Sequence, residues 1–304
     1  MRLLGRYYNG NYMVSIYDDG TKIRENELSF FDPVFPENID IKITNRCDMG
    51  CPMCHENSTP DGRNVDLMSL KFIDSLQPYT ELAIGGGNIF ENPDLFYFLK
   101  KLKDLHIIAN ITVNQRHFEQ YYSLIRYAMQ YKYIHGVGVS LVDATSDFLY
   151  LVKQAGPNVV IHTIVGLLTK EQIDILRNNR LKILLLGYKD FGRGHTYLED
   201  NRETLLKNME YTRNKLDEIL HSFEVVSFDN LAIEQLEPNR LLTEKEYDEF
   251  YMGDEGQFTM YVDAVNKQFA KNSISKIRYP LKDNIMDMFK IVKKEIWQNL
   301  FFLI

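Results

Sequence analysis

The chain of 304 residues has three cysteines, and all of them lie in the stretch Cys47-Asp-Met-Gly-Cys51-Pro-Met-Cys54. Thiolates are nucleophiles and ligands for soft metals. Thiols this close together cannot staple distant parts of a fold, and an odd number leaves at least one unpaired, so a disulfide framework is not expected. The cluster therefore predicts metal or redox chemistry in a reducing compartment.

Three explanations of the cluster compete. Free cysteine often packs as a small apolar residue, but three thiols in a loop with glycine and proline do not form a core. Structural zinc needs four ligands, usually from two separated pairs, and His55 directly follows Cys54, so that chelation of one ion by both would be strained. Iron–sulfur clusters normally have four cysteine ligands, so three thiolates would leave one iron open to another molecule.

Short apolar runs alternate with helical patterns from residue 38 onward, and six strand-then-helix units are predicted. The strands are rich in Val, Ile and Leu, as expected for a parallel sheet buried on both faces. The expected strands are 39–43, 81–84, 107–113, 136–142, 159–165 and 182–186. The expected helices are 67–76, 95–102, 118–129, 147–154, one capped by Thr169, and 201–221.

Right-handed crossovers would wind these units into an α/β fold, a partial (β/α)6 TIM-like barrel, although a doubly wound flat sheet also fits the pattern. The cysteine loop directly follows the first strand, at the end of the barrel where active sites gather.

Residues 1–37 are expected to form an N-terminal hairpin extension, with Tyr12 to Arg24 turning at Asp19-Gly20. Residues 38–222 would form the barrel. Residues 223–304 would form a β-rich and helical C-terminal extension that covers it, with a terminal helix at 281–299.

Composition adds three expectations. The chain is 45% hydrophobic and 25% charged, as in ordinary globular proteins. Its net charge of −7 does not favour nucleic acid as a partner. No apolar run reaches membrane-spanning length and the N-terminus lacks a signal-peptide pattern, so no membrane association and a cytoplasmic location are expected.

The C-x3-C-x2-C loop after the first strand, followed by glycines at the end of the second, resembles the radical S-adenosylmethionine (radical SAM) superfamily. The resemblance covers roughly residues 38–222 and implies that Cys47, Cys51 and Cys54 ligate three irons of a [4Fe-4S] cluster. In that family the fourth iron binds the amino and carboxylate groups of S-adenosylmethionine. The residue before the third cysteine is usually aromatic and near the adenine; here it is Met53.

Further family positions map onto later strand ends. Gly85-Gly86-Gly87-Asn88 resembles the family's GGE segment, with Asn88 in place of the glutamate, and would contact the amino group of the cofactor. Asn114 and Ser140 resemble positions that contact its ribose or carboxylate, and Ile164 could contact adenine. Gly187 opens a glycine-rich loop in which Arg193 could bind a carboxylate.

The resemblance implies an enzyme that cleaves S-adenosylmethionine reductively, so that a 5′-deoxyadenosyl radical abstracts a hydrogen atom from a substrate. It also implies a small electron donor such as flavodoxin or ferredoxin. With no fourth cysteine, no auxiliary cysteine-ligated cluster or cysteine-containing SPASM domain is expected. The segment Gly256–Asp263 weakly favours a peptide or protein substrate. A small molecule or nucleotide substrate, and a non-catalytic zinc- or cluster-stabilised binding protein, are the alternatives.

Overall fold

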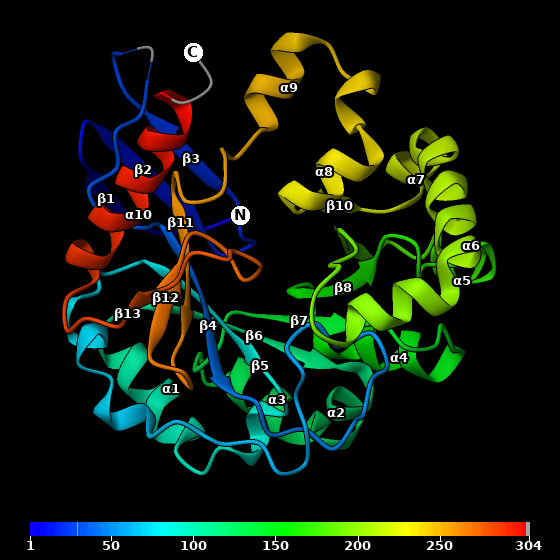
Figure 1. Ribbon diagram of the computed structural model, residues 1–304, viewed down its shortest axis with the longest axis horizontal. Coiled ribbons are helices and arrows are strands. Elements are labelled where there is room, and N and C mark those ends of the chain that lie inside the picture. Colours follow the sequence, from blue (N-terminus) through cyan, green and yellow to red (C-terminus); the bar gives the residue numbers. More distant parts are fainter. Residues whose placement is uncertain (29, 302–304) are drawn as a thin grey trace.

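The computed structural model describes residues 1–28 and 30–301, with side chains described to residue 296; two β-sheets and their surrounding helices make up the molecule (Figure 1). A three-stranded sheet has the order β1-β2-β3, and a ten-stranded sheet has the order β10-β9-β8-β7-β6-β5-β4-β11-β12-β13. The strands are β1 (Leu3–Asn9), β2 (Tyr12–Tyr17), β3 (Lys22–Glu25), β4 (Asn38–Thr44), β5 (Glu81–Gly86), β6 (Ile108–Asn114), β7 (Gly136–Ser140), β8 (Val159–Ile164), β9 (Lys182–Leu186), β10 (Val225–Phe228), β11 (Thr259–Asp263), β12 (Gln268–Ala270) and β13 (Tyr279–Pro280).

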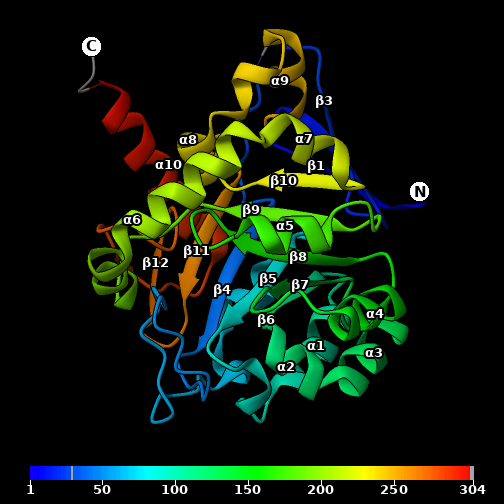
Figure 2. The same cartoon turned by 90° about the vertical axis from the view of Figure 1, so that its right-hand side faces the viewer.

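Most helices follow a strand and pack outside the large sheet. They are α1 (Leu95–Asp104), α2 (Gln115–Gln120), α3 (Tyr122–Gln130), α4 (Ser146–Ala155), α5 (Lys170–Leu176), α6 (Arg193–Asn214), α7 (Leu216–Ser222), α8 (Asn230–Leu236), α9 (Glu244–Phe250) and α10 (Ile285–Phe301). Helices α1–α4 gather beside β5–β7, while α6 and α7 lie toward β9 and β10 (Figure 2). No described helix is both long enough and apolar enough to cross a membrane.

The large sheet is mainly parallel, as the sequence predicts. All six expected strands, β4–β9, pair in chain order with parallel register. Two further parallel strands come from residues after 222: β10 pairs with β9, and β11 pairs with β4 on the opposite side. Among the described strands of this sheet, β12 alone runs against the others, because it pairs antiparallel with both β11 and β13. The chain thus has a mixed α/β fold around a large parallel sheet, and that sheet continues beyond residue 222.

Several helices differ in extent from the sequence prediction. Residues 67–76 form two short 3-10 helices, Leu67–Ser69 and Lys71–Ser75, because Leu70 adopts a non-helical ψ of 87° between them. The expected helix 118–129 is divided at Tyr121 into α2 and α3. The expected helix 201–221 starts earlier, at Arg193, is bent at Asn201 and ends as α7.

Other local signals are confirmed. The buried face of α1 consists of Leu95, Phe98, Leu99 and Leu102, the residues predicted from helical spacing. Thr169 caps α5 through a reciprocal capping box with Gln172, which satisfies donors that a helix start leaves free. The hairpin β2–β3 turns at Asp19-Gly20, where Gly20 has a φ of +92° that favours glycine.

The three-stranded sheet lies against the N-terminal ends of the parallel strands. The amide of Asn158, just before β8, donates to the carbonyl of Asp18 in the hairpin at 2.9 Å. The Glu37 carboxylate, fully buried, accepts from Tyr12 at 2.6 Å and from two nitrogens of Arg24 at 2.9 and 3.0 Å. Lys22 bridges Glu37 and Glu81 at 3.3 and 2.7 Å. These contacts join both sheets through one buried carboxylate.

Replacement of Glu37 should show how much this junction contributes to the unfolding free energy of the protein. Burial alone would raise the pKa of Glu37, but Lys22 and Arg24 outweigh it and hold the pKa below its usual value. Glu37→Gln leaves the mostly buried Arg24 without its carboxylate and Lys22 with Glu81 alone, so we expect a loss of about 3–5 kcal/mol in unfolding free energy, measured with urea at pH 7. The control Glu25→Gln, on the exposed face of β3, should change stability by less than about 0.5 kcal/mol.

The same junction predicts an acid dependence. A carboxylate whose pKa is lowered by folding stabilises the native state above its unfolded pKa and loses that contribution as the pH falls through the native value. As the pH falls below about 5, the unfolding free energy of the wild type should therefore decrease more steeply than that of Glu37→Gln. Equal slopes in urea titrations across this range would contradict the assignment.

Candidate functional site

The large sheet encloses a cavity of about 1220 Å³. Its wall carries side chains from every strand from β4 to β9, and its rim is formed where these strands end. The cysteine loop lies at this rim, directly after β4, and all three cysteines line the cavity. The expectation that the cysteines lie at the carboxyl ends of the strands beside an internal space agrees with this arrangement.

The three thiols are half-buried and close enough to influence one another. Burial raises the pKa of Cys47, and the neighbouring Cys51 and Cys54 raise it further. Burial and Cys54 likewise raise the pKa of Cys51, and Arg193 partly offsets this. Three ionised thiols in this position repel one another, so a bound cation or cationic cluster would stabilise them together. The donor set fits an iron–sulfur or zinc group.

The glycines that end β5 allow the cysteine loop to pack closely against the strand. A Cβ atom on Gly87 would lie 2.1 Å from the carbonyl oxygen of Arg46 and 3.1 Å from the Cβ of Cys47. Gly86 has a φ of +120°, and a side chain there would meet the Thr44 carbonyl at 2.3 Å. Gly85, by contrast, has ordinary space around it. All three glycines line the cavity beside the cysteines.

Four other predicted residues also line the cavity: Met53 of the cysteine loop, and Asn114, Ser140 and Ile164 from strand ends. The amide nitrogen of Asn114 lies 3.9 Å from the sulfur of Cys51, while its oxygen accepts from the backbone of Arg116 and starts α2. The structure therefore brings these residues and the three cysteines to one cavity.

Three predicted residues lie outside the described cavity lining. The oxygen of Asn88 accepts from the Phe90 backbone, and its own backbone donates to the Arg46 carbonyl at 2.7 Å. The Gly187 backbone donates to Asp229 at 2.8 Å, and a Cβ there would collide with Leu231. Both residues fix the loops around the rim.

Arg193 is the third, and its contacts are with the cysteine loop. Its guanidinium donates to the carbonyl oxygens of Cys51 at 3.1 Å and Ser58 at 3.0 Å. Its backbone nitrogen donates to the Cys54 carbonyl at 3.1 Å and to the Asn57 side chain at 2.8 Å. The start of α6 thus fastens residues 51–58 at four points, a role that the spacing of the sequence does not indicate.

Two sets of polar contacts beside the cysteine loop were not predicted from the sequence. Nε2 of the buried His117 lies 2.7 Å from Oδ1 of Asp48, and both groups lie within 4.8 Å of the Cys47 sulfur. His117 follows a predicted strand end, which is a usable signal, but its partner lies 69 residues earlier. Such a pair becomes visible only when the fold brings the two loops together.

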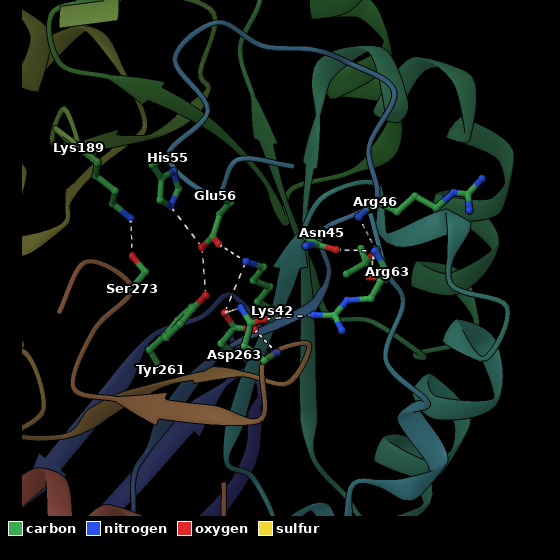
Figure 3. A network of polar contacts seen from close by, with 12 residues as sticks. Lys42, Asn45, Arg46, His55, Glu56, Arg63, Lys189, Tyr261, Asp263 and Ser273 are labelled. Atoms are coloured by element: carbon green, nitrogen blue, oxygen red, sulfur yellow. Dashed lines mark hydrogen bonds and ion pairs between the residues drawn. The ribbon is translucent and has the colours of Figure 1, made fainter. Parts of the chain in front are cut away.

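The second is a polar network between the cysteine loop and β11 (Figure 3). The Lys42 ammonium lies 2.6 Å from Glu56 and 3.5 Å from Asp263, and Tyr261 donates to Glu56 at 3.0 Å. Burial lowers the pKa of the adjacent His55 to about 4, so the ring is neutral at pH 7. The network ties the strand contributed by the C-terminal segment to the loop that carries the cysteines.

The architecture to be compared with known proteins is a large, mainly parallel sheet, extended beyond β4 by β11, with a cysteine loop at the rim of a cavity. No family model matches the chain, and neither does any curated protein.

Solved structures of SuiB from Streptococcus suis share the fold. SuiB bound to the precursor peptide SuiA matches with a TM-score of 0.58 and 19% identity, over 85% of this chain and 65% of that chain. SuiB bound to S-adenosylmethionine matches with a TM-score of 0.54 and 18% identity, over 85% and 64%. A further SuiB structure matches with a TM-score of 0.55 and 15% identity, over 94% and 86%. In the first two comparisons the chain spans slightly less than two thirds of the matched protein.

Removal of the Arg193 side chain should loosen the cysteine loop. Arg193→Ala deletes two charge-assisted hydrogen bonds, each contributing about 1.5–3 kcal/mol. We expect residues 51–58 to be cleaved several-fold faster by thermolysin, which cuts before apolar residues such as Met53, in the metal-free protein. We also expect the variant to retain less iron after anaerobic reconstitution. Arg202→Ala, exposed on the same helix, serves as control and should match the wild type. Wild-type cleavage rates and iron content in Arg193→Ala would show that the clamp does not hold the loop.

Proposed function

We propose that this protein is a radical SAM enzyme whose [4Fe-4S] cluster is held by Cys47, Cys51 and Cys54. One observation carries the proposal: all three cysteines of the chain face one cavity, at the carboxyl ends of parallel strands, in a fold shared with a protein solved with S-adenosylmethionine bound. We further propose that the sheet β4–β9 corresponds to the partial (β/α)6 barrel of this family, that residues 1–37 are an N-terminal extension and that 223–304 are a C-terminal one.

The remaining rim residues are assigned to S-adenosylmethionine. Met53 and Ile164 supply apolar contacts for the adenine, and Asn114 and Ser140 supply polar contacts for the ribose or carboxylate. Gly85, Gly86 and Gly87 present their backbone to the amino group. Asn88, Gly187 and Arg193 act one step further away, because their hydrogen bonds hold the loops that carry the contacting residues.

The cofactor pair, when bound, supplies the 5′-deoxyadenosyl radical that abstracts a hydrogen atom. The chain itself orients the cofactor, positions the substrate and limits access of water. His55 directly follows Cys54, and the exposed Asp48 beside Cys47 is held by a 2.7 Å contact with the buried His117. A reactive species formed at the rim therefore faces the internal cavity rather than bulk water.

We propose a peptide as the substrate, because SuiB, which shares the fold, was solved with a precursor peptide bound. A small molecule or nucleotide remains the alternative within the same chemistry. A small electron donor such as flavodoxin or ferredoxin would reduce the cluster, and we place the reaction in the cytoplasm, where thiols stay reduced.

A zinc-stabilised binding protein is the second candidate function. The observation that favours it is the proximity of Cys47, Asp48 and His117, whose ligand atoms lie within 4.8 Å of one another. Thiolate, carboxylate and imidazole are all zinc ligands. Such a site would use only one of the three cysteines, which is why it ranks second.

Metal analysis and cofactor cleavage test the main proposal. After anaerobic reconstitution we expect about four irons per chain and a broad brown absorbance. With S-adenosylmethionine and dithionite, 5′-deoxyadenosine should form. Cys51→Ala should lose at least 90% of both signals, whereas His117→Ala should keep most of the iron. Stoichiometric zinc with no cofactor cleavage in the wild type would replace this proposal with the second candidate.

Ser140 provides a separate test of the cofactor assignment. Ser140→Ala removes one hydroxyl at the end of β7 without changing the cysteine loop. Loss of one hydrogen bond to a bound ligand should weaken S-adenosylmethionine binding about fivefold to tenfold, with iron content unchanged. Equilibrium dialysis of the reconstituted protein measures the affinity, and metal analysis of the same sample measures the iron content. Unchanged affinity would remove Ser140 from the cofactor site.

A further inference from the structure

The cavity contains one carboxylate that the proposed cofactor site does not use, that of Asp40. Asp40 lies in the middle of β4, and its side chain is accessible from the cavity that it lines. It precedes the strand end at Thr44 by four residues, which places it about 13 Å below the rim at ordinary strand rise. The carboxylate therefore faces the interior, well below the cysteines.

Other acidic groups along the cavity wall have polar partners. Asp229 accepts from the backbones of Gly187 and Ala232, and Glu255 accepts from Asn272. The remaining four are bonded in the same way: Asp18 to Arg2, Asp19 to Thr21, Glu56 to Lys42 and Glu81 to Lys22. Among the residues that the structure describes, none forms a hydrogen bond of good geometry or an ion pair within 4 Å with Asp40. Among the described residues of the lining, Asp40 is thus the acidic side chain without a close hydrogen-bond or ion-pair partner.

The surroundings of Asp40 leave its charge underbalanced. Burial raises the pKa of Asp40, and Lys189 and the nearby Asn38 amide offset this only in part, while Asp229 raises it further. The Lys189 ammonium donates to Ser273 at 2.9 Å and forms no ion pair within 4 Å with Asp40. Across the whole cavity wall seven acidic residues stand against four basic ones. The interior therefore favours an incoming positive charge.

We infer that Asp40 binds a cationic group of the substrate, a primary ammonium or a guanidinium, inside the cavity below the cysteine rim. This inference rests on the proposed function, since it names the substrate class of the same cavity. An ion pair in this enclosed position is stronger than one at the surface, and a charge-assisted hydrogen bond gives it direction. The anchor would hold one end of the substrate deep in the cavity and leave the reacting carbon nearer the rim. Lysine or arginine side chains of a peptide and free alkylamines share this chemistry.

Binding to the reconstituted protein, with S-adenosylmethionine present and no reductant, tests the inference. The probes are the peptides acetyl-Gly-Gly-X-Gly-Gly-amide with X as Lys, Arg or the neutral isostere norleucine, together with free pentylamine, and dissociation constants are measured by NMR titration. We expect the wild type to bind a basic peptide about tenfold more tightly than the norleucine peptide. Tighter binding of the peptide than of pentylamine would identify a peptide as the source of the cation, and equal binding would identify a small amine.

Two variants separate a specific contact from general charge. Asp40→Asn keeps the shape of the side chain and should reduce the tenfold preference to about onefold to twofold. Asp248→Asn removes an exposed carboxylate on α9 and should leave the preference unchanged. Asp40→Asn removes a carboxylate that has no close partner, so its melting temperature should equal or exceed that of the wild type. This measurement serves as the control that the variant is folded.

A wild type without preference for the basic probes, or an Asp40→Asn variant that keeps the preference, would overturn the inference. The experiment needs no turnover, so its outcome is independent of 5′-deoxyadenosine formation. Failure of cofactor cleavage would remove the proposed function and leave the charge preference measurable, while failure of the charge preference would leave the proposed chemistry intact.

Discussion

Three thiol groups held within reach of one another are the constraint around which this structure is arranged. Ionised thiols repel, and a loop of this length has no regular secondary structure to resist that repulsion. The fold supplies the resistance from outside: glycines at the end of β5 let the loop press against the strand, and Arg193 at the start of α6 fastens its far side by four hydrogen bonds. The positions of β5 and α6 thus matter for the thiols as much as the loop sequence does.

A second set of charges fixes the opposite end of the sheet. The buried Glu37 joins the N-terminal three-stranded sheet to the first parallel strands, with Arg24, Lys22 and Tyr12 as partners. The hairpin turn that this junction holds contributes Asp18 and Asp19 to the lining of the cavity. The cavity therefore has the three cysteines at its rim, and the turn between β2 and β3 of the three-stranded sheet at its opposite end. Asp40 lies between the two, where the wall is polar but the contacts are incomplete.

Local patterns predicted much of this fold. Continuous Val, Ile and Leu runs identified the six parallel strands, and helical spacing identified the buried face of α1. Cysteine spacing, together with glycines one unit later, predicted which residues would meet at the rim, and Met53, Asn114, Ser140 and Ile164 do lie there. These successes share a cause: each signal lies within one element or at the end of one strand, and strand ends in a parallel sheet meet at one edge.

Contacts between distant segments could not be predicted in the same way. The pair Asp48–His117 and the placement of Tyr261 against Glu56 depend on how loops approach after the sheet has formed. Arg193 was expected to bind a carboxylate because it stands between glycines, yet those glycines shape a helix start whose donors reach the cysteine loop. A guanidinium donates to neutral carbonyls as well as to carboxylates, so residue type alone could not decide between them.

The pairing of β11 with β4 has a consequence for biosynthesis. Residues 259–263 complete an edge that starts at residue 38, so β4 has an unpaired side until more than two hundred further residues have left the ribosome. An apolar strand left open in this way is prone to pair with other chains. Contacts so distant in sequence also form slowly. A nascent chain of this protein thus carries its cysteine loop beside an unfinished sheet edge for most of translation, and maturation of the thiol site has to wait for the last third of the polypeptide.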